Sequence, residues 1–215
     1  VQHTAHIQCD RRVRRGGCFG FSAAPLDETL DLATARSVAS RAVAMAGSLS
    51  SATLRAGDWA PEEAHRGEWS TPIEIDPFTV PLEERLSLLL EADASMAGAD
   101  ETVVREASCS LRREEQWQVS SEGSELHQTL TRCGAGISTT AAAHGQVQRR
   151  SYPASFGGNY SSAGWEHVLG LELAKHGARI RDESVALCSA DPCPGGARTL
   201  VIGGSQLMLQ IHESV

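Results

Sequence analysis

The middle of the chain has the pattern of a long β-hairpin, and this pattern restricts the possible folds more than any other feature. Over residues 102–144 apolar and polar residues alternate in approximate period two, which is typical of strands with one buried face. The sequence Ser120-Ser121-Glu122-Gly123 interrupts this alternation and places a glycine where a turn needs a positive φ. The apolar positions are Val103, Val104, Trp117, Val119, Leu126, Leu130 and Ile137. We therefore expect two long antiparallel strands, extended by a third near residues 146–152.

Helical patterns lie on both sides of this hairpin. Before it, a helix is predicted from Leu82 to about Gly98, where glycine ends it. After it, a helix is predicted over residues 164–187, with a break around Gly177. The face expected to be buried on the first of these helices carries Leu82, Leu86, Leu89, Leu90 and Met96. A long antiparallel hairpin with flanking helices indicates an α+β fold.

The N-terminal part forms a smaller unit of strands and one helix. Residues 1–24 have the pattern of strands that end in a glycine-rich run, and Pro25 then favours the first turn of a helix that runs to about Gly47. Residues 48–80 show no sustained periodicity and are predicted to be a linker that packs by its tryptophans.

Three domains are therefore expected along the chain. Residues 1–48 form a first α/β domain that is incomplete at its N-terminus, and residues 76–190 form a middle α+β domain. Residues 197–215 are expected to begin a third, C-terminal domain.

The charge and the apolar runs exclude two classes of partner. A net charge of −8 argues against nucleic acid, because phosphates repel an acidic surface. The one basic cluster, Arg11, Arg12, Arg14 and Arg15, fits the solvated face of an edge strand, with a phosphate-binding patch as the alternative. The longest apolar runs, such as residues 86–90, are too short to span a bilayer, so no membrane segment is expected.

The six cysteines are scattered rather than clustered. They stand at Cys9, Cys18, Cys109, Cys133, Cys188 and Cys193. A chain of 215 residues with this spacing lacks the dense framework of a small secreted protein, so reduced, structural thiols in a cytoplasmic protein are predicted. The chain begins with Val1, so either a leader has been removed or the chain belongs to a larger protein.

The C-terminal segment predicts a buried strand followed by a helix. Residues 199–202 have the pattern of a short buried strand, Gly203-Gly204 ends it, and Ser205 is a suitable N-cap for a final helix. No glycine, basic turn or proline closes this helix before Val215, which suggests truncation. Its apolar residues Leu207 and Ile211 should then be exposed or loosely packed.

This final helix carries the one pair of residues that suggests catalytic chemistry, His212-Glu213. Such a pair is most often an ordinary solvent-facing pair on a helix. A strand, a glycine break and a capped apolar helix would nevertheless present an imidazole and a neighbouring carboxylate rigidly. In zinc peptidases the imidazole binds the metal, and the adjacent glutamate takes a proton from metal-bound water.

The last sixteen residues, 200–215, resemble the segment of TldD-type proteins that opens their H-E-x-x-x-H motif. Weaker similarities to the TldD/PmbA family occur in the family's order at Phe19-Gly20-Phe21-Ser22-Ala23, Ser121-Glu122-Gly123, Ser155-Phe156-Gly157-Gly158, Gly164-Trp165-Glu166 and Cys193-Pro194-Gly195-Gly196. The resemblance implies a zinc metallopeptidase that hydrolyses peptide bonds in unfolded or small peptides. In it His212 would be the first Zn²⁺ ligand and Glu213 the general base.

The chain departs from the family's pattern at both ends. The family's second histidine would fall two residues past Val215, and its cysteine ligand further still, so one protein ligand of three is present. The family also begins with a helix and strands before the position of Val1. By the same resemblance, the subunit would form a homodimer or a heterodimer with a PmbA-like subunit. The alternative is a non-catalytic module that forms the chamber wall or the dimer surface of such an assembly.

Overall fold

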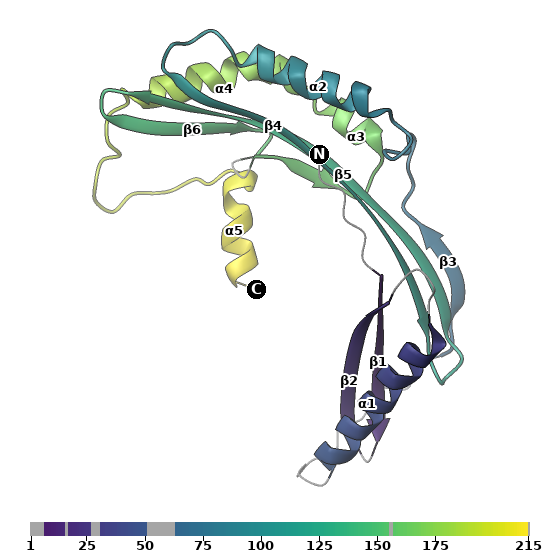
Figure 1. The fold of residues 1–215 in the computed structure, drawn as a ribbon. Helices are drawn as coiled ribbons and strands as arrows, with labels where there is room; N and C mark the ends of the chain where they lie inside the picture. The colour runs from purple at the N-terminus through teal and green to yellow at the C-terminus, as the bar shows by residue number, and fades with distance from the viewer. Residues whose placement is uncertain (1–6, 16, 27–30, 51–62, 155–156, 215) are drawn as a thin grey trace. The chain divides into compact units, whose positions relative to one another are not determined.

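A computed structural model describes residues 7–15, 17–26, 31–50, 63–154 and 157–214 (Figure 1). The chain divides into two compact units, Val1–Glu63 and Ala64–Val215. The fold is α+β, as the sequence predicts. None of the helices in the described ranges is long and apolar enough to cross a membrane.

The first unit is a two-stranded antiparallel sheet with one helix packed against it. β1 (Ile7–Arg15) and β2 (Cys18–Leu26) pair along their full length, and α1 (Leu32–Ser50) contacts both strands. The helix buries Val38, Ala42 and Ala46, which recur every four residues and so lie on one face. Gly20 of β2 lies beneath this face, and a Cβ there would collide with the carbonyl oxygen of Ala42. Small residues on both elements therefore allow the helix to approach the sheet closely.

The predicted start of this helix at Pro25 is wrong. Pro25 lies inside β2, opposite Gln8, and the helix begins at Leu32. The carboxylate of Asp31 accepts hydrogen bonds from the N–H groups of Ala33 (2.9 Å) and Thr34 (3.1 Å), which satisfies donors of the first helical turn. Proline is tolerated in β2 because each strand of a two-stranded sheet has an outer edge that needs no N–H donor.

The basic cluster of this unit is described only in part. Arg14 and Arg15 are exposed on β1, as predicted for a solvated strand face. The side chains of Arg11 and Arg12 lie outside the described residues.

The second unit is built around one long central strand, β5 (Glu125–Ala143). On one side β5 pairs with the antiparallel β4 (Thr102–Val119), from Thr102 opposite Ala141 to Val119 opposite Glu125. Its other side is shared by three short strands. These are the parallel β3 (Arg66–Ser70) and the antiparallel β7 (Asn159–Ser161) and β6 (Gln146–Tyr152).

The hairpin turn between β4 and β5 agrees with the sequence prediction. Gly123 has a φ of 101°, a conformation that favours glycine. The N–H of Gly123 donates to the carbonyl of Ser120 (3.2 Å), and the N–H of Ser120 donates to that of Ser124 (3.0 Å). The predicted third strand at residues 146–152 is β6.

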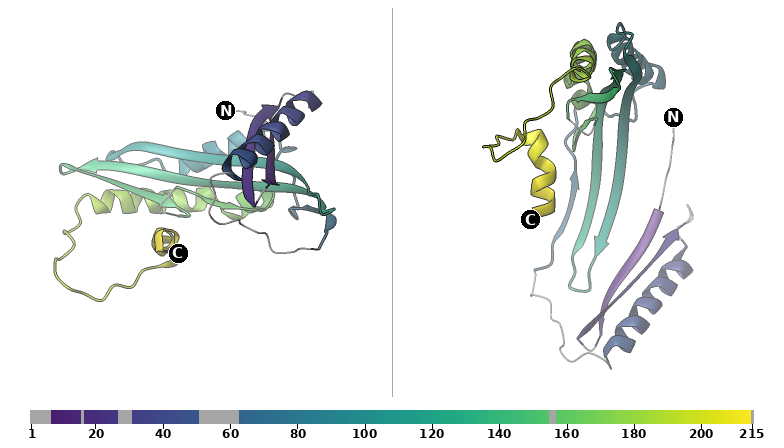
Figure 2. Two further views of the ribbon diagram at one scale, coloured as in Figure 1. Left: turned by 90° about the horizontal axis from the view of Figure 1, so that it is seen from below. Right: turned by 90° about the vertical axis from the view of Figure 1, so that its left-hand side faces the viewer.

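Three helices cover one face of the half of this sheet that lies away from the hairpin turn (Figures 1 and 2). They are α2 (Leu82–Ser95), α3 (Trp165–Gly170) and α4 (Leu173–Leu187). α2 contacts β4 and α4, whereas α4 contacts β5 and β6. The buried core between helices and sheet consists of Val80, Ala92, Met96, Cys133, Ala135, Ile137, Trp165, Val168, Leu173 and Ile180.

The predicted buried face of α2 is largely wrong. Met96, just after the helix, is buried and Leu89 is half-buried, but Leu82, Leu86 and Leu90 are exposed. The helix instead packs through Ala92, with Leu88 partly buried beside it. Small residues are favoured at this contact because α4 comes close to the end of α2.

The predicted helix break at Gly177 is also wrong. Gly177 is buried inside α4, where a Cβ would meet Ser95 and lie 3.0 Å from Cγ of Met96. The break lies between α3 and α4, where Glu172 has a left-handed φ of 47°. Glycine at position 177 thus serves the approach of two helices rather than the end of one.

Two segments differ from their predicted secondary structure. The expected linker over residues 48–80 contains the strand β3, whose partner β5 is distant in sequence. Residues 199–202 form no strand, and Leu200 and Val201 are 77% and 90% exposed. An apolar run of four residues becomes a strand only where another strand pairs with it.

Candidate functional site

The predicted site residues lie on α5 (Gly204–Ser214), the last helix of the described chain. Its first turn is formed by hydrogen bonds from the N–H groups of Gln206 (2.9 Å) and Leu207 (3.0 Å) to the carbonyl of Gly203. The helix thus begins one residue before Ser205, the predicted N-cap.

His212 and Glu213 are both exposed in the last turn of α5. The helix buries none of its residues, and Leu207 is half-buried while Ile211 is 54% exposed. The exposure of this apolar face agrees with the sequence expectation. Adjacent helix residues point about 100° apart, so the two side chains do not face each other across a pocket.

Among the described residues, the donor set around His212 is too small to hold a zinc ion. Zinc in proteins takes three or four His, Cys, Asp or Glu ligands in a tetrahedral arrangement. Within the described ranges, no three such side chains lie together as a metal site requires. His212 and Glu213 therefore form at most a fraction of a metal centre.

Two thiols of the second unit, Cys133 and Cys188, are buried and donate hydrogen bonds to backbone carbonyls. Cys109, Cys133, Cys188 and Cys193 form no disulfide in the described structure. Cys133 donates to the carbonyl of Gly164 (2.7 Å), and burial, with Glu166 and Cys109 nearby, raises its pKa to about 11. A thiol with this pKa stays protonated at neutral pH and is a poor metal ligand.

Two carboxylates that sequence reasoning missed hold the segment before α2 in place. Glu166, in the first turn of α3, accepts hydrogen bonds from the N–H groups of Gly164 (2.7 Å) and Ile75 (3.0 Å). Asp76 forms an ion pair with Arg113 of β4 (2.7 Å) and accepts from the N–H of Phe78 (2.9 Å). The Arg113 guanidinium, with this N–H, lowers the pKa of Asp76.

These contacts explain why such carboxylates are poor candidates for catalysis. Each carboxylate accepts hydrogen bonds from donors of the chain itself, and each joins segments far apart in sequence. For Glu166 the sequence offered two signals, the family similarity of Gly164-Trp165-Glu166 and an acidic residue in a first helical turn, and neither indicated its contact with Ile75.

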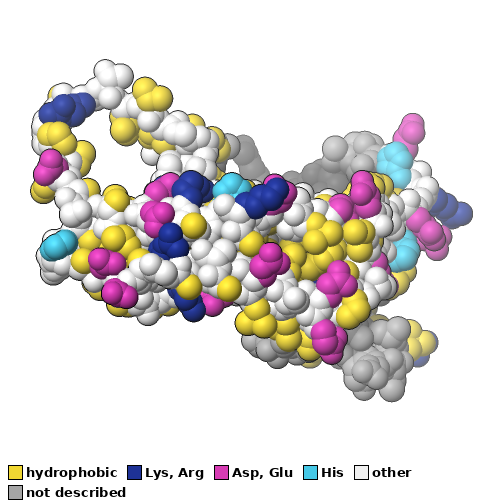
Figure 3. Space-filling view, turned by 90° about the horizontal axis from the view of Figure 1, so that it is seen from above, with side chains coloured by type: hydrophobic (Ala, Val, Ile, Leu, Met, Phe, Trp, Pro, Cys, Tyr) yellow, Lys and Arg dark blue, Asp and Glu magenta, His cyan; other side chains and the backbone are white. Residues whose placement is uncertain are grey.

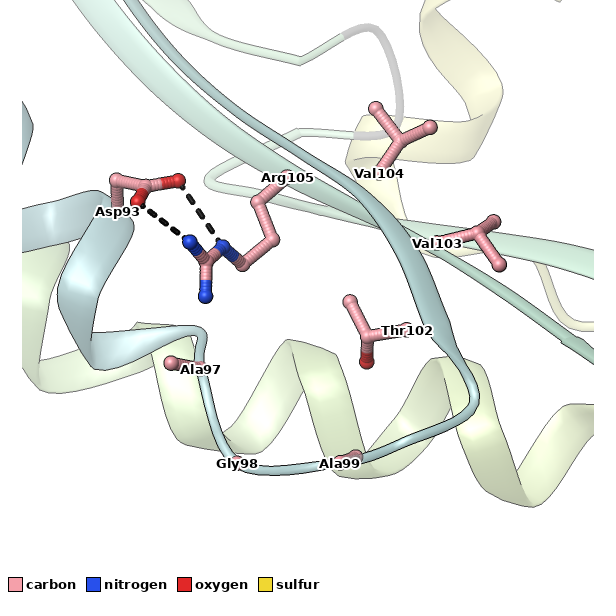
Figure 4. A pocket seen from close by; sticks show the side chains of 8 residues that line it. All are labelled: Asp93, Ala97, Gly98, Ala99, Thr102, Val103, Val104 and Arg105. Atoms are coloured by element: carbon pink, nitrogen blue, oxygen red, sulfur yellow. Dashed lines mark hydrogen bonds and ion pairs between the residues drawn. The ribbon is translucent and has the colours of Figure 1, made fainter.

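A hollow of about 320 Å³ lies between the end of α2 and the start of β4 (Figure 4). Its two charged side chains neutralise each other, because Arg105 donates to both oxygens of Asp93 at 3.2 and 3.0 Å. The rest of its lining consists of Ala97, Gly98, Ala99, Thr102, Val103 and Val104. This lining offers no paired base and nucleophile, so we do not assign catalysis to it.

Comparison with known families gives a match in the middle of the chain. Residues 75–186 match the model of the PmbA/TldA metallopeptidase central domain. The matched region runs from just before α2 to the last turn of α4, and α5 with His212 and Glu213 lies outside it. No curated protein matches the chain.

Comparison with solved structures supports the same fold. The chain is similar to the crystal structure of a proposed modulator of a DNA gyrase from Thermotoga maritima, with a TM-score of 0.64 and 12% sequence identity. The similarity covers 88% of this chain and 39% of that one. This chain therefore spans well under half the length of that protein.

Proposed function

Because this chain belongs to the PmbA/TldD family, we propose that it is part of a metallopeptidase that hydrolyses peptide bonds in small or unfolded peptides. The observation that carries the proposal is the match of residues 75–186 to the central domain of these metallopeptidases. We further propose zinc as the metal, a cytoplasmic location and a second subunit as partner. The scattered spacing of the six cysteines, which lacks the dense framework of a small secreted protein, supports a reducing compartment.

Within this function, the described chain supplies the sheet-and-helix scaffold and two groups for the metal centre. We assign His212 as one metal ligand and Glu213 as the group that accepts the proton from the attacking water. The support is the resemblance of residues 200–215 to the family's motif. One imidazole cannot hold zinc usefully, so further ligands would come from outside the described residues. No catalytic step follows from these residues alone.

The experiment measures zinc content and peptide cleavage in the natural full-length protein and in two variants. His212→Ala should lose bound zinc and cleavage together, because a ligand is removed. Glu213→Gln should keep zinc but lower kcat by about a hundredfold or more, because a proton acceptor is removed. Glu122→Gln, at the exposed hairpin turn, is the matched control and should leave both quantities unchanged.

Two outcomes contradict the assignment. Full cleavage by Glu213→Gln would remove the role given to Glu213, and unchanged zinc content in His212→Ala would remove the role given to His212.

A non-catalytic module of the same assembly is the second candidate, and the incomplete donor set favours it. It predicts a full-length protein that assembles with a second subunit but binds no zinc and cleaves no peptide. The same measurements on the unmodified protein therefore distinguish the two functions.

A further inference from the structure

A second hollow of the second unit lies against β6, and the charged residues of its lining are all basic. Its volume is about 220 Å³, and Arg149, Arg150 and Arg179 line it, together with Tyr152 and the start of α5. None of the residues described in its lining is acidic. The whole chain has a net charge of −8, so this hollow gathers positive charge in a chain that is acidic as a whole.

The lining shows that the hollow follows the outer edge of β6. Successive residues of a strand point to opposite faces of the sheet. Four successive residues of β6, Arg149 to Tyr152, nevertheless all line the hollow, so it extends around the edge of the strand. The inner edge of β6 is paired with β5, and in the described part of the chain no strand pairs with its outer edge. A ligand at this edge can therefore reach side chains of both sheet faces.

Glu183 of α4 holds two of these arginines in place. Its carboxylate accepts hydrogen bonds from Nε of Arg150 (2.9 Å) and from Nη1 of Arg179 (2.8 Å). These hydrogen bonds, that of Arg179 first, lower the pKa of Glu183 and keep its carboxylate charged at neutral pH. One carboxylate cannot neutralise two guanidinium groups, so the three side chains together keep a positive charge. Figure 3 shows basic side chains gathered beside acidic ones on the helical face of the molecule.

The ring of Tyr152 limits the motion of Arg179 further. The guanidinium carbon of Arg179 lies 5.7 Å from the centroid of this ring, and His176 stacks on the ring at 3.8 Å. Tyr152 itself packs against the buried core. Because Arg179 is held by both Glu183 and Tyr152, it loses less conformational entropy when a ligand binds.

Arg149 supplies the third positive charge of the hollow. Its Nη2 donates to Glu106 of β4 and to Ser138 of β5, both at 2.9 Å. A guanidinium carries five N–H donors, so donors on Nε and Nη1 remain for a ligand. Even when the carboxylates of Glu106 and Glu183 are both counted, the three arginines leave one net positive charge.

The start of α5 forms another wall of the hollow. Ser205 and Gln206, in the first turn of this helix, belong to the lining. The N–H groups of Gln206 and Leu207 donate to the carbonyl of Gly203, but the first N–H groups of an α-helix have no partner within it. The positive end of the helix dipole therefore adds to the field of the arginines.

The positions of these donors fit a phosphate group better than a carboxylate. A carboxylate is planar, and two guanidinium groups are enough to occupy it, as Glu183 shows. In the hollow the donors come from β6, α4 and α5, and therefore from several directions. A phosphate monoester presents three acceptor oxygens and a charge of about −1.5 to −2 at neutral pH. It matches both the directions of the donors and the excess of positive charge.

We propose that the hollow between β6, α4 and α5 binds the phosphate group of a small ligand through Arg149, Arg150 and Arg179. The ligand is free phosphate or a small phosphate monoester, which share the group that the arginines recognise. His212 lies seven residues after Ser205, about 10 Å further along α5, so the phosphate site is separate from the candidate metal ligand. The proposal does not rest on peptidase activity, because it requires neither a metal nor cleavage.

The test is isothermal titration calorimetry of the full chain with three probes at one ionic strength. The probes are inorganic phosphate, glycerol phosphate and acetate, and the constant ionic strength keeps screening equal. We expect saturable binding of one phosphate per chain, with a Kd at least about tenfold lower than that of acetate. Tighter binding of glycerol phosphate than of inorganic phosphate identifies a monoester as the ligand. Equal or weaker binding identifies free phosphate.

Variants of the lining connect this binding to the hollow. Arg150→Gln and Arg179→Gln should each raise the Kd for phosphate by about tenfold, because charge-assisted hydrogen bonds are lost. Ser205→Asp should raise it by a similar factor, because it adds a negative charge to the lining. Arg112→Gln is the matched control and should leave the Kd unchanged, because Arg112 is an exposed arginine of β4 outside the lining.

The unfolding midpoint separates loss of binding from loss of folding. The side chains of Arg150 and Arg179 are 45% and 47% exposed, so the loss of either ion pair with Glu183 should change the midpoint little. Ser205→Asp removes neither ion pair, and aspartate is favourable at the start of a helix. This variant therefore tests the site even where an arginine variant unfolds.

Three outcomes would overturn the proposal. They are the absence of saturable phosphate binding, binding of acetate as tight as that of phosphate, and an effect of Arg112→Gln as large as that of the lining variants. The last would show a response to net charge rather than a site. Binding is measured without zinc and without peptide, so this proposal and the proposed function can fail separately.

Discussion

Glu166 shows how a single side chain joins two distant segments of the second unit. Its carboxylate accepts hydrogen bonds from Gly164 at 2.7 Å and Ile75 at 3.0 Å. Burial acts to raise the pKa of Glu166, but these N–H donors outweigh burial and leave the pKa lowered. We predict that Glu166→Gln lowers the free energy of unfolding by about 1–3 kcal/mol, because charge-assisted hydrogen bonds are lost. Urea denaturation at neutral pH measures this loss.

The loss of stability caused by Glu166→Gln should become smaller as the pH falls. A carboxyl whose pKa is lowered on folding contributes stability above its ordinary value of 4.5, and this contribution disappears as the pH falls through the lowered pKa. The difference between the original chain and Glu166→Gln should therefore shrink on acidification. The exposed Glu122→Gln serves as control. A difference that stays constant across this range would contradict the role given to the carboxylate.

At the scale of elements, the contact between α2 and α4 depends on one glycine. A Cβ at position 177 would meet Ser95 and Met96, whereas one at Gly170 of α3 would meet nothing within 4 Å. In a helix alanine is more favourable than glycine by about 1 kcal/mol, so Gly170→Ala should leave the free energy of unfolding unchanged or raise it. We predict that Gly177→Ala destabilises by about 1–3 kcal/mol through overpacking. Urea unfolding followed by the fluorescence of the buried Trp165 compares the two, and equal stability would contradict the prediction.

The elements that the sequence predicts well are those specified by local patterns. The hairpin and its turn are confirmed, because the period-two alternation of the strands and the glycine of the turn, Gly123, are local signals. Features that depend on distant partners were missed. β3 is a strand only because β5 pairs with it, and Gly177 is buried only because α2 lies against it. Leu82, Leu86 and Leu90 of α2 were predicted to be buried but are exposed, because the sequence of an apolar helix face does not show whether another surface covers it.

Residue patterns predicted the candidate site less well than they predicted the fold. His212 and Glu213 were singled out through a family resemblance, and the described structure shows them exposed on a helix without further ligands. The contacts of Glu166 and of Asp76 with Arg113 each join segments more than thirty residues apart. No spacing rule within the sequence connects such residues.

At the scale of the whole molecule, the division at Glu63 and Ala64 predicts two separate unfolding events. The core of the second unit is formed by residues of that unit. In the first unit, α1 packs against β1 and β2. Gly20→Val should unfold the first unit, because its side chain would collide with the backbone of Ala42 and Ala46. Hydrogen exchange in β4, β5 and α4 should stay unchanged, while exchange in α1 rises to that of an open chain. Faster exchange in both units would mean that they unfold as one and would contradict the prediction.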